Sequence, residues 1–367
     1  MSYVILPSQV LKECLSKGYI LSDIPIAEDA LQPASLDLRL GAKAWRVAAS
    51  FLPGQNQSNA GHSGSADVAD KIETLKMHEI DLTQGAIFEK GCVYIVVLEE
   101  GLALPRDIKG RANPKSSTGR LDVFARVMTD QSTSFDNIPQ GYHGKIYVEI
   151  APRTFSIRVK RGDRLVQLRL SKEVETESKI DDAIKIPSKL PFTVDVEGSC
   201  TGNKPDSGDF PPIIGWRARK HAGLIDISKI KHYPILDYWE PVFARKKGGI
   251  ILDPDDFYIL ATREAVAIPF DYAAEMQAYD TSFGEFRVHY AGFFDPGFGM
   301  DEAGGKGARG VLEVRTHEVP FLIDAHQIVG HLVFEKMTAA SDKIYGSGLK
   351  SNYQGQGLHL AKQFIHI

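Results

Sequence analysis

Apolar and polar residues alternate along much of this chain with the two-residue period that is typical of β-strands. Residues 34–41 (ASLDLRLG) set three leucines against Asp37 and Arg39 on the opposite side of the chain. Further segments are rich in β-branched and aromatic residues and are bounded by glycine, proline or charge: 92–100, 144–151, 156–162 and 163–170. One amphipathic helix is expected at 7–17. Many short strands separated by turn signals predict a closed or sandwiched β fold.

The second half of the chain repeats the first at one constant offset. Identical residues coincide at this offset: Tyr94 with Tyr258, Glu100 with Glu264, Pro105 with Pro269, and Glu149 with Glu313. The apolar positions of 163–170 also stay in register with those of 327–334. Because polar residues recur as well as hydrophobic ones, we interpret the chain as a tandem duplication with local gaps in its loops.

The duplication predicts two domains, residues 1–170 and 213–367, each a distorted β-barrel or jelly roll with few short helices. Residues 171–212 are rich in charge, glycine and proline, and we expect a linker or long connection there. Residues 53–67 are polar and rich in glycine and serine, which is typical of a mobile loop.

Composition narrows the class of protein. Hydrophobic residues make up 43% and charged residues 25%, which is typical of a soluble globular protein. The net charge of -4 argues against a nucleic-acid-binding surface, which needs clustered cations. The three cysteines lie far apart and predict neither a disulfide framework nor a zinc site. No membrane span or signal peptide is expected, so a cytoplasmic protein is the default expectation.

Candidate chemistry in the first half centres on KSSTGR, residues 115–120, where two cations flank two serines and a threonine. Such a segment supplies charge-assisted hydrogen bonds to phosphate oxygens, although similar turns are also common on protein surfaces. The second half has Tyr279, Asp280 and Thr281 at the repeat offset, and Gly284 opposite Arg120. The second copy therefore lacks a phosphate motif.

The second half carries other groups instead. It contains DPGFG (295–299), VLEV (311–314) and a tail rich in tyrosine, glycine and glutamine (345–357). The corresponding region of the first half runs into the acidic 171–212 connection. The halves thus hold complementary fragments, which is what a site between two domains would contain.

A family resemblance rests on motifs from both halves: QPASLDLRLG (32–41), KSSTGR (115–120), DPGFG (295–299), VLE (311–313) and YGSGLKSNYQGQG (345–357). Together they resemble the dCTP deaminase family of the trimeric dUTPase superfamily. The resemblance covers 1–170 and 213–367, and it implies two tandem dUTPase-like domains. It also implies deamination of dCTP to dUTP and ammonia, which supplies dUTP for thymidylate synthesis.

The resemblance implies a role for each motif. The triphosphate would be held by Lys115, Ser116, Ser117 and Arg120; sugar and base would be contacted by Asp295, Leu312 and Glu313; and Tyr345, Asn352 and Gln356 would close over the nucleotide. Two positions depart from the family pattern. Lys115 stands where arginine is usual, and lysine cannot form the bidentate fork. Asn352 stands where lysine is usual, and nearby Lys350 is an alternative.

The chemistry implied is free of zinc, because the chain has no HxE…PCxxC pattern of the zinc deaminases. Glu313 would take the proton from water, Ser116 would position that water, and Asp295 would accept from the sugar hydroxyl. Mg²⁺ would accompany the triphosphate. Glu149 holds the same strand position as Glu313, and it would be the base instead if each domain served its own pocket; otherwise it would be vestigial or structural.

Two other functions stay open. The first is a dUTP diphosphatase or a bifunctional deaminase-diphosphatase, although the tail YQGQGLHL lacks the arginine and phenylalanine of the diphosphatase RGSGGFG-like tail. The second is a non-catalytic nucleotide sensor or scaffold. The expected partners are nucleotides of the dCTP, dUTP and dTTP type, without nucleic acid or membrane. Both a monomer with an internal interface and a homo-oligomer remain open.

Overall fold

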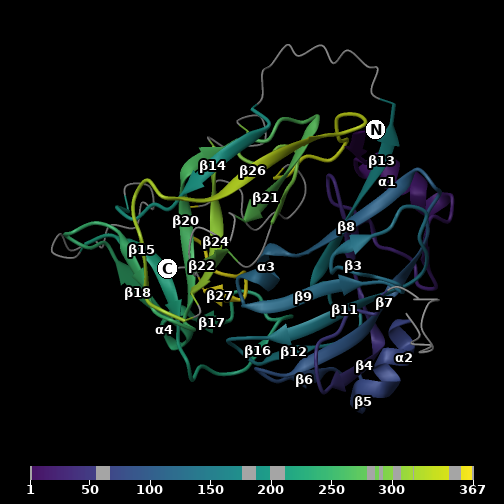
Figure 1. Ribbon diagram of the computed structural model, residues 1–367, viewed down its shortest axis with the longest axis horizontal. Coiled ribbons are helices and arrows are strands. Elements are labelled where there is room, and N and C mark those ends of the chain that lie inside the picture. The colour runs from purple at the N-terminus through teal and green to yellow at the C-terminus, as the bar shows by residue number, and fades with distance from the viewer. Residues whose placement is uncertain are drawn as a thin grey trace, which may run out of the picture. The chain divides into compact units, whose positions relative to one another are not determined.

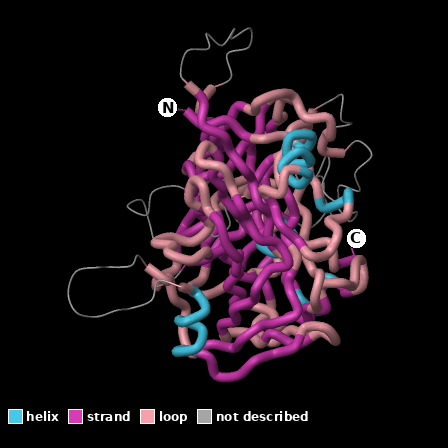
Figure 2. The backbone as a smooth tube through the Cα atoms, turned by 90° about the vertical axis from the view of Figure 1, so that its right-hand side faces the viewer, coloured by secondary structure: helices cyan, strands magenta, loops and turns pink. Residues whose placement is uncertain are grey.

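The chain folds mainly into strands with few short helices, as predicted (Figure 2). The computed structural model describes residues 2–54, 67–175, 187–198, 211–278, 286–288, 292–300, 307–316, 318–346 and 357–365. Its helical segments are α1 (Ser8–Ser16), η1 (Glu28–Ala30), α2 (Val68–Leu75), α3 (Ser116–Gly119) and α4 (Ile235–Tyr238). The predicted helix at 7–17 is α1, and it buries Leu11 and Cys14. Most of the predicted loop at 53–67 lies outside the described residues, and no described helix is long and apolar enough to cross a membrane.

Two compact units divide the chain. The first comprises Met1–Ser178, Leu224–Ser228 and Met337–Asp342, and the second comprises Lys179–Gly223, Lys229–Lys336 and Lys343–Ile367. Two short stretches of the second half therefore belong to the first unit. The domain bounds proposed from the sequence treat each half as one continuous piece, so they place these two stretches in the second domain.

Among the residues that the structure describes, three sheets build the first unit (Figure 1). One has the order β1-β13-β8-β10, with β3 also pairing β13, and its strands are Ser2–Ile5, Val166–Val174, Ile108–Pro114, Asn137–Ile138 and Leu36–Leu38. Another has the order β5-β4-β7-β11-β9, with β2 pairing β7, and its strands are Lys76–Asp81, Leu40–Val47, Val93–Ala103, His143–Pro152, Val123–Met128 and Ile20–Ser22. The third has the order β16-β12-β6, with strands Ile225–Asp226, Ile157–Val159 and Ala86–Phe88.

The two late stretches complete the first unit through specific contacts. Strand β16 pairs in parallel with β12, with Ile225 opposite Ile157. In the other stretch, Ser341 Oγ lies 3.0 Å from Ser8 Oγ at the start of α1 and donates to the carbonyl of Pro33 at 2.8 Å. The first unit therefore depends on residues more than three hundred positions along the chain from its N-terminal helix.

Four sheets are found among the described residues of the second unit (Figure 1). The larger two have the orders β14-β26-β21-β23 (Lys189–Thr193, Ile328–Lys336, Tyr272–Ala278, Phe293–Phe294) and β18-β15-β20-β24-β22 (Trp239–Phe243, Ile213–Ala218, Phe257–Val266, Ala308–Thr316, Phe286–Val288). Two-stranded sheets pair β17 with β27 (Tyr233–Pro234, Phe364–Ile365) and β19 with β25 (Ile250–Leu252, Phe321–Ile323). Side chains of both larger sheets share one core, which includes Phe192, Leu260, Met276, Leu312 and Leu332. Apolar alternation on facing strands thus produces the expected sandwich.

Strand β14 lies inside the segment that the sequence marks as a connection, 171–212. Its Leu190 pairs with Leu332, just as Leu36 of β3 pairs with Leu168 in the first unit. The described part of the connection therefore contributes an edge strand to the second unit, in the position that β3 occupies in the first.

The predicted repeat reappears in the strand registers. Ile95 lies opposite Glu149 on β7 and β11, and their counterparts at the repeat offset, Ile259 and Glu313, lie opposite each other on β20 and β24. A hydrogen bond is repeated too: the hydroxyl of Tyr94 accepts from the backbone N–H of Glu89 at 2.9 Å, and that of Tyr258 accepts from the N–H of Asp253 at 3.0 Å. Shared register and shared polar contacts mark the two units as copies of one fold.

Candidate active site

The KSSTGR segment forms a tight turn at the end of β8, in the first unit. Lys115 precedes the short helix α3, and its backbone N–H donates to the carbonyl of Leu165 at 2.9 Å. The hydroxyl of Thr118 donates to the same carbonyl at 2.8 Å. Ser117 and Arg120 are buried, whereas Ser116 is exposed. The two bonds to Leu165 fix the turn against the start of β13, so the segment is held rather than loose.

An ion pair joins this turn to the first motif of the chain. The ammonium of Lys115 contacts the carboxylate of Asp37 on β3, through Oδ2. Asp37 is 2% exposed, and its other oxygen accepts no hydrogen bond from the described residues. The Lys115 side chain keeps 23% of its surface exposed. Two predicted motifs thus meet, and the buried carboxylate of Asp37 fixes the first cation of the KSSTGR turn.

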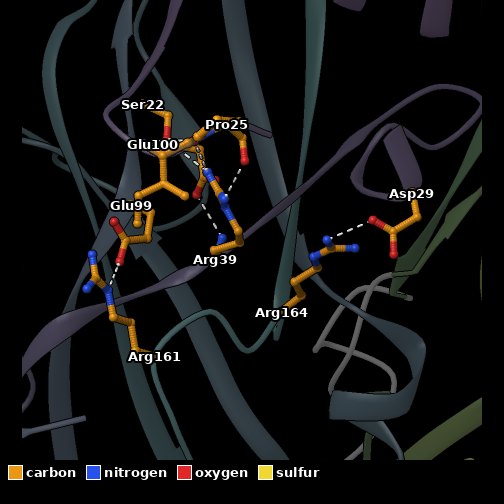
Figure 3. Close-up of polar contacts among 9 residues, drawn as sticks. Ser22, Pro25, Asp29, Arg39, Glu99, Glu100, Arg161 and Arg164 are labelled. Carbon is orange, nitrogen blue, oxygen red and sulfur yellow. Dashed lines mark hydrogen bonds and ion pairs between the residues drawn. The ribbon is translucent and has the colours of Figure 1, made fainter. Parts of the chain in front are cut away.

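A second buried pair positions β3 itself (Figure 3). Nε of Arg39 donates to Glu100 at 2.6 Å, and the backbone N–H of Arg39 donates to the same carboxylate at 2.7 Å. The guanidinium also donates to Ser22 Oγ and to the carbonyl of Pro25. Burial raises the pKa of the Glu100 carboxyl, although the arginine bonds oppose the rise. In the second unit, Glu264 accepts the backbone N–H of Thr193 at 2.8 Å in the same way.

Glu149 is fully buried on β11 and is paired with an arginine. Its cross-strand neighbour on β9 is Arg126, whose Nε and Nη2 both donate to Oε1, the former at 3.1 Å. The guanidinium of Arg126 also lies 4.0 Å from the ring centroid of Phe135. Oε2 of Glu149 accepts no hydrogen bond from the described residues. One carboxylate oxygen is therefore engaged by a cation of the same unit.

Glu313 occupies the matching position on β24 and is 5% exposed. Its neighbour Leu312 is completely buried in the core of the second unit. The side chain of Leu312 serves packing, so contact with a substrate is open only to its backbone groups.

The DPGFG turn and Tyr345 come together in the second unit. The backbone N–H of Tyr345 donates to the carbonyl of Pro296 at 2.9 Å, and its ring centroid lies 5.4 Å from that of Phe298. Gly299 has φ +71°, and a Cβ there would lie 2.1 Å from the carbonyl oxygen of Val266. Only glycine fits such a close approach. The turn that carries Asp295 is thereby locked against the residue that begins the predicted C-terminal segment.

Asn352 and Gln356 lie outside the described residues, as do Lys350, Tyr279, Asp280, Thr281 and Gly284. The chain that follows is packed: Leu358 and Leu360 are buried, and Phe364 pairs with Tyr233 between β27 and β17. The predicted C-terminal segment is thus flanked by fixed residues on both sides.

Sequence reasoning missed Asp37 and Arg126 as partners of the predicted site residues. Asp37 was expected only as the polar side of an alternating strand, yet the whole of β3 is buried. The sequence gave no signal for this pair, because Asp37 and Lys115 are 78 residues apart. Arg126 gave no signal, because its pairing depends on the register between β9 and β11.

Comparisons with known proteins agree with this fold and these motifs. The description "2'-deoxycytidine 5'-triphosphate deaminase (DCD) N-terminal domain" matches residues 2–174, and "2'-deoxycytidine 5'-triphosphate deaminase (DCD), C-terminal domain" matches residues 163–364. The crystal structure of 2'-deoxycytidine 5'-triphosphate deaminase from Agrobacterium tumefaciens is 47% identical and superposes with a TM-score of 0.79, covering 92% of this chain and 100% of that chain.

Shorter relatives match about half of the chain. The dCTP deaminase of Acidianus ambivalens is 24% identical over 165 residues, which are 45% of this chain and 82% of the relative. The "dCTP deaminase, dUMP-forming" of Methanobrevibacter smithii is 24% identical over 192 residues, 51% of this chain and 84% of the relative. The two domain descriptions together cover residues 2 to 364, and the solved structure is matched over its full length. This chain therefore belongs to the dCTP deaminase family.

Proposed function

We propose that this protein hydrolyses the C4 amine of dCTP with a glutamate-activated water, and that it releases ammonia and dUTP. The observation that carries the proposal is the pair of equivalent strand carboxylates, Glu149 and Glu313, the first of which commits an oxygen to the arginine on its neighbouring strand. Membership of the dCTP deaminase family supplies the substrate class.

The triphosphate is assigned to the turn of the first unit. Lys115 and Arg120 supply positive charge, and Ser117 supplies a hydroxyl donor. Charge-assisted hydrogen bonds of this kind are the strong ones in phosphate recognition. The substrate is the Mg²⁺ complex of dCTP, in which the metal offsets part of the phosphate charge.

The chemical step is assigned to Glu313. The carboxylate takes a proton from a water molecule whose oxygen forms a bond to C4 of the cytosine ring. The attack opens the C4=N3 double bond, and Glu313 passes the proton to N3. Glu313 then takes the proton of the new C4 hydroxyl and passes it to the amine, so that the C4–N4 bond breaks, ammonia leaves and C4 becomes a carbonyl. Ser116, the exposed serine of the turn, positions the water, and Asp295 accepts a hydrogen bond from the sugar hydroxyl.

Support for Glu313 over Glu149 comes from Arg126. A general base must present an oxygen to water, and Oε1 of Glu149 already accepts two guanidinium N–H groups within a site that is 0% exposed. The carboxylate of the first unit therefore suits a structural role. The assignment of the base to Glu313 follows the resemblance of residues 311–313 to the family motif.

The test is product analysis with dCTP and Mg²⁺. Ammonia and dUTP in equal amounts support the proposal. Ammonia together with dUMP and diphosphate identifies the bifunctional reaction, a second candidate favoured by the relatives that are named dUMP-forming. Tight nucleotide binding without release of ammonia overturns both and identifies a sensor.

A further inference from the structure

Arg164 lies directly beside the phosphate turn, although none of the motifs includes it. Strands β13 and β8 are antiparallel with Val166 opposite Pro114. The bond from the N–H of Lys115 to the carbonyl of Leu165 continues this pairing by one residue. Arg164 is the chain neighbour of Leu165, whose carbonyl holds the turn. A second cation therefore lies one residue from the point where the turn is anchored, with 23% of its side chain exposed.

One hairpin supplies a carboxylate to each of the two cations. Residues 28–38 turn back on themselves through the bond from the N–H of Gln32 to the carbonyl of Ser35 at 2.8 Å. At one end, Asp37 pairs with Lys115. At the other, Asp29 accepts from Nη2 of Arg164 at 2.9 Å (Figure 3). The hydrogen bond from Arg164 lowers the pKa of Asp29, and the charge of Lys115 adds to this effect, so the cations act on one region.

The two ion pairs differ in burial. Asp37 is 2% exposed, whereas the side chain of Asp29 is 75% exposed. An ion pair with so exposed a partner contributes little to stability, because water screens the attraction. A polyphosphate, which carries more charge than one carboxylate, competes for the guanidinium of Arg164 at small cost.

The second copy of the fold lacks the charged residues that form these two ion pairs. At the repeat offset, Lys115 corresponds to Tyr279 and Arg164 to Ile328. The strand registers place Pro191 where the first unit has Asp37, since Leu190 pairs with Leu332 and Leu36 with Leu168. A charge set that served the fold would be needed in both copies. Its presence in one copy alone indicates a role in binding.

We propose that Arg164 is a further triphosphate-binding residue of this site, with Asp29 as its displaceable counterion. Its planar guanidinium supplies the bidentate fork that Lys115 cannot form. The inference rests on the proposed function, because it assumes that the turn binds the phosphates of the nucleotide.

Three variants test this role. The first, Arg164→Ala, removes the cation and is expected to raise the KM for dCTP about tenfold with kcat little changed. The second, Arg164→Lys, keeps the charge without the fork and is expected to recover only part of the loss. The third, Asp29→Asn, removes the competitor and is expected to lower the KM. The matched control is Arg161→Ala, three residues before Arg164 in the chain. Arg161 pairs with Glu99 at 2.6 Å, and its loss should leave the KM for dCTP unchanged.

The inference requires that the KM for dCTP changes in opposite directions in Arg164→Ala and Asp29→Asn. If the ion pair serves only the fold, Arg164→Ala and Asp29→Asn both raise the KM for dCTP, and that result overturns the inference. An unchanged KM in Arg164→Ala also overturns it. Failure of the proposed function looks different, since the unaltered protein would then release no ammonia from dCTP. In that event, equilibrium binding of dCTP and dCMP to the same variants tests the inference alone, which requires Arg164→Ala to weaken dCTP binding far more than dCMP binding.

Discussion

Replacing Glu149 and Glu313 by glutamine, one at a time, separates a structural carboxylate from a chemical one. The two residues sit at equivalent positions of equivalent strands, opposite Ile95 and Ile259. Each variant is therefore the control for the other, because both replace a buried strand glutamate by an amide of the same shape. We expect Glu149→Gln to lower stability and retain turnover, and Glu313→Gln to abolish turnover and retain dCTP binding.

The size of the stability effect follows from the Arg126 contacts. Removing one partner of a buried ion pair costs about 3–5 kcal/mol. Glutamine keeps an acceptor oxygen, and the side chain of Arg126 is 35% exposed, so water replaces part of the lost interaction. We expect Glu149→Gln to cost about 2 kcal/mol of unfolding free energy. The variant Arg126→Met leaves a completely buried carboxylate without its cation and should cost more, while the double variant should cost less than the sum.

The size of the catalytic effect follows from the role of the base. General acid–base catalysis contributes about 10²–10⁴ to the rate, so Glu313→Gln should lower kcat by about a thousandfold. Glu149→Gln should stay within about threefold of the unaltered enzyme, because in this assignment its carboxylate touches no reacting atom.

The assay combines urea unfolding with ammonia release and dCTP binding for each purified variant. A folded Glu149→Gln protein that binds dCTP but releases no ammonia, together with an active Glu313→Gln protein, would refute the assignment of the base. Loss of turnover in both variants would show that each copy contributes to the reaction and would equally contradict a single base per chain.

The remaining predictions concern the repeat, the thiols and one carboxylate. Tyr94→Phe and Tyr258→Phe each delete the same hydrogen bond to a backbone N–H, so each should cost about 1 kcal/mol of unfolding free energy in chemical denaturation. Burial raises the pKa of the Cys14 thiol, so iodoacetamide should label the partly exposed Cys92 in the native protein and Cys14 only after unfolding, as read by peptide mass spectrometry. The pKa of Asp29 is lowered from its ordinary 3.8, so its ion pair should persist above that pH and dissociate as the pH falls through the lowered value; NMR titration should show the pKa rising again when the arginine partner is removed.

Much of the fold was accessible from the sequence because its local signals agree with one another. The β-rich segments 92–100 and 144–151 became the paired strands β7 and β11, and the amphipathic stripe at 7–17 became α1. The offset that takes Tyr94 to Tyr258 also holds for the registers of β20 with β24 and of β21 with β26. A repeat that preserves strand pairing must preserve spacing along each strand, which is why a single offset was enough.

The single offset does not hold for every strand, because loop lengths differ between the two copies. Trp45 and Arg46 lie opposite Ile95 and Tyr94, and Trp216 and Arg217 lie opposite Ile259 and Tyr258. This Trp-Arg pair recurs at a longer offset than the tyrosines do, because the loops between strands differ in length between the copies. The same slippage concealed β14 within the predicted connection.

Contacts between distant residues were beyond local patterns altogether. Asp29 and Arg164 are 135 residues apart, and Ser8 and Ser341 are 333 apart. No period or motif links such residues, since they meet only after several strands have paired. The sequence therefore singled out residues 115–120 but gave no sign of the ion pair between Asp29 and Arg164.

The two buried glutamates occupy equivalent positions in the two copies of the fold, and the proposed function gives them different roles. A carboxylate on a central strand is costly to bury alone, and each copy of the fold inherits that cost. In the first unit, Arg126 on the adjacent strand offsets it, and the cation–π contact with Phe135 further fixes the guanidinium. A pair stabilised in this way resists the displacement that a general base requires. Under the proposed function, one substrate needs only one set of phosphate cations and one base, so the two copies can differ in which of these they carry.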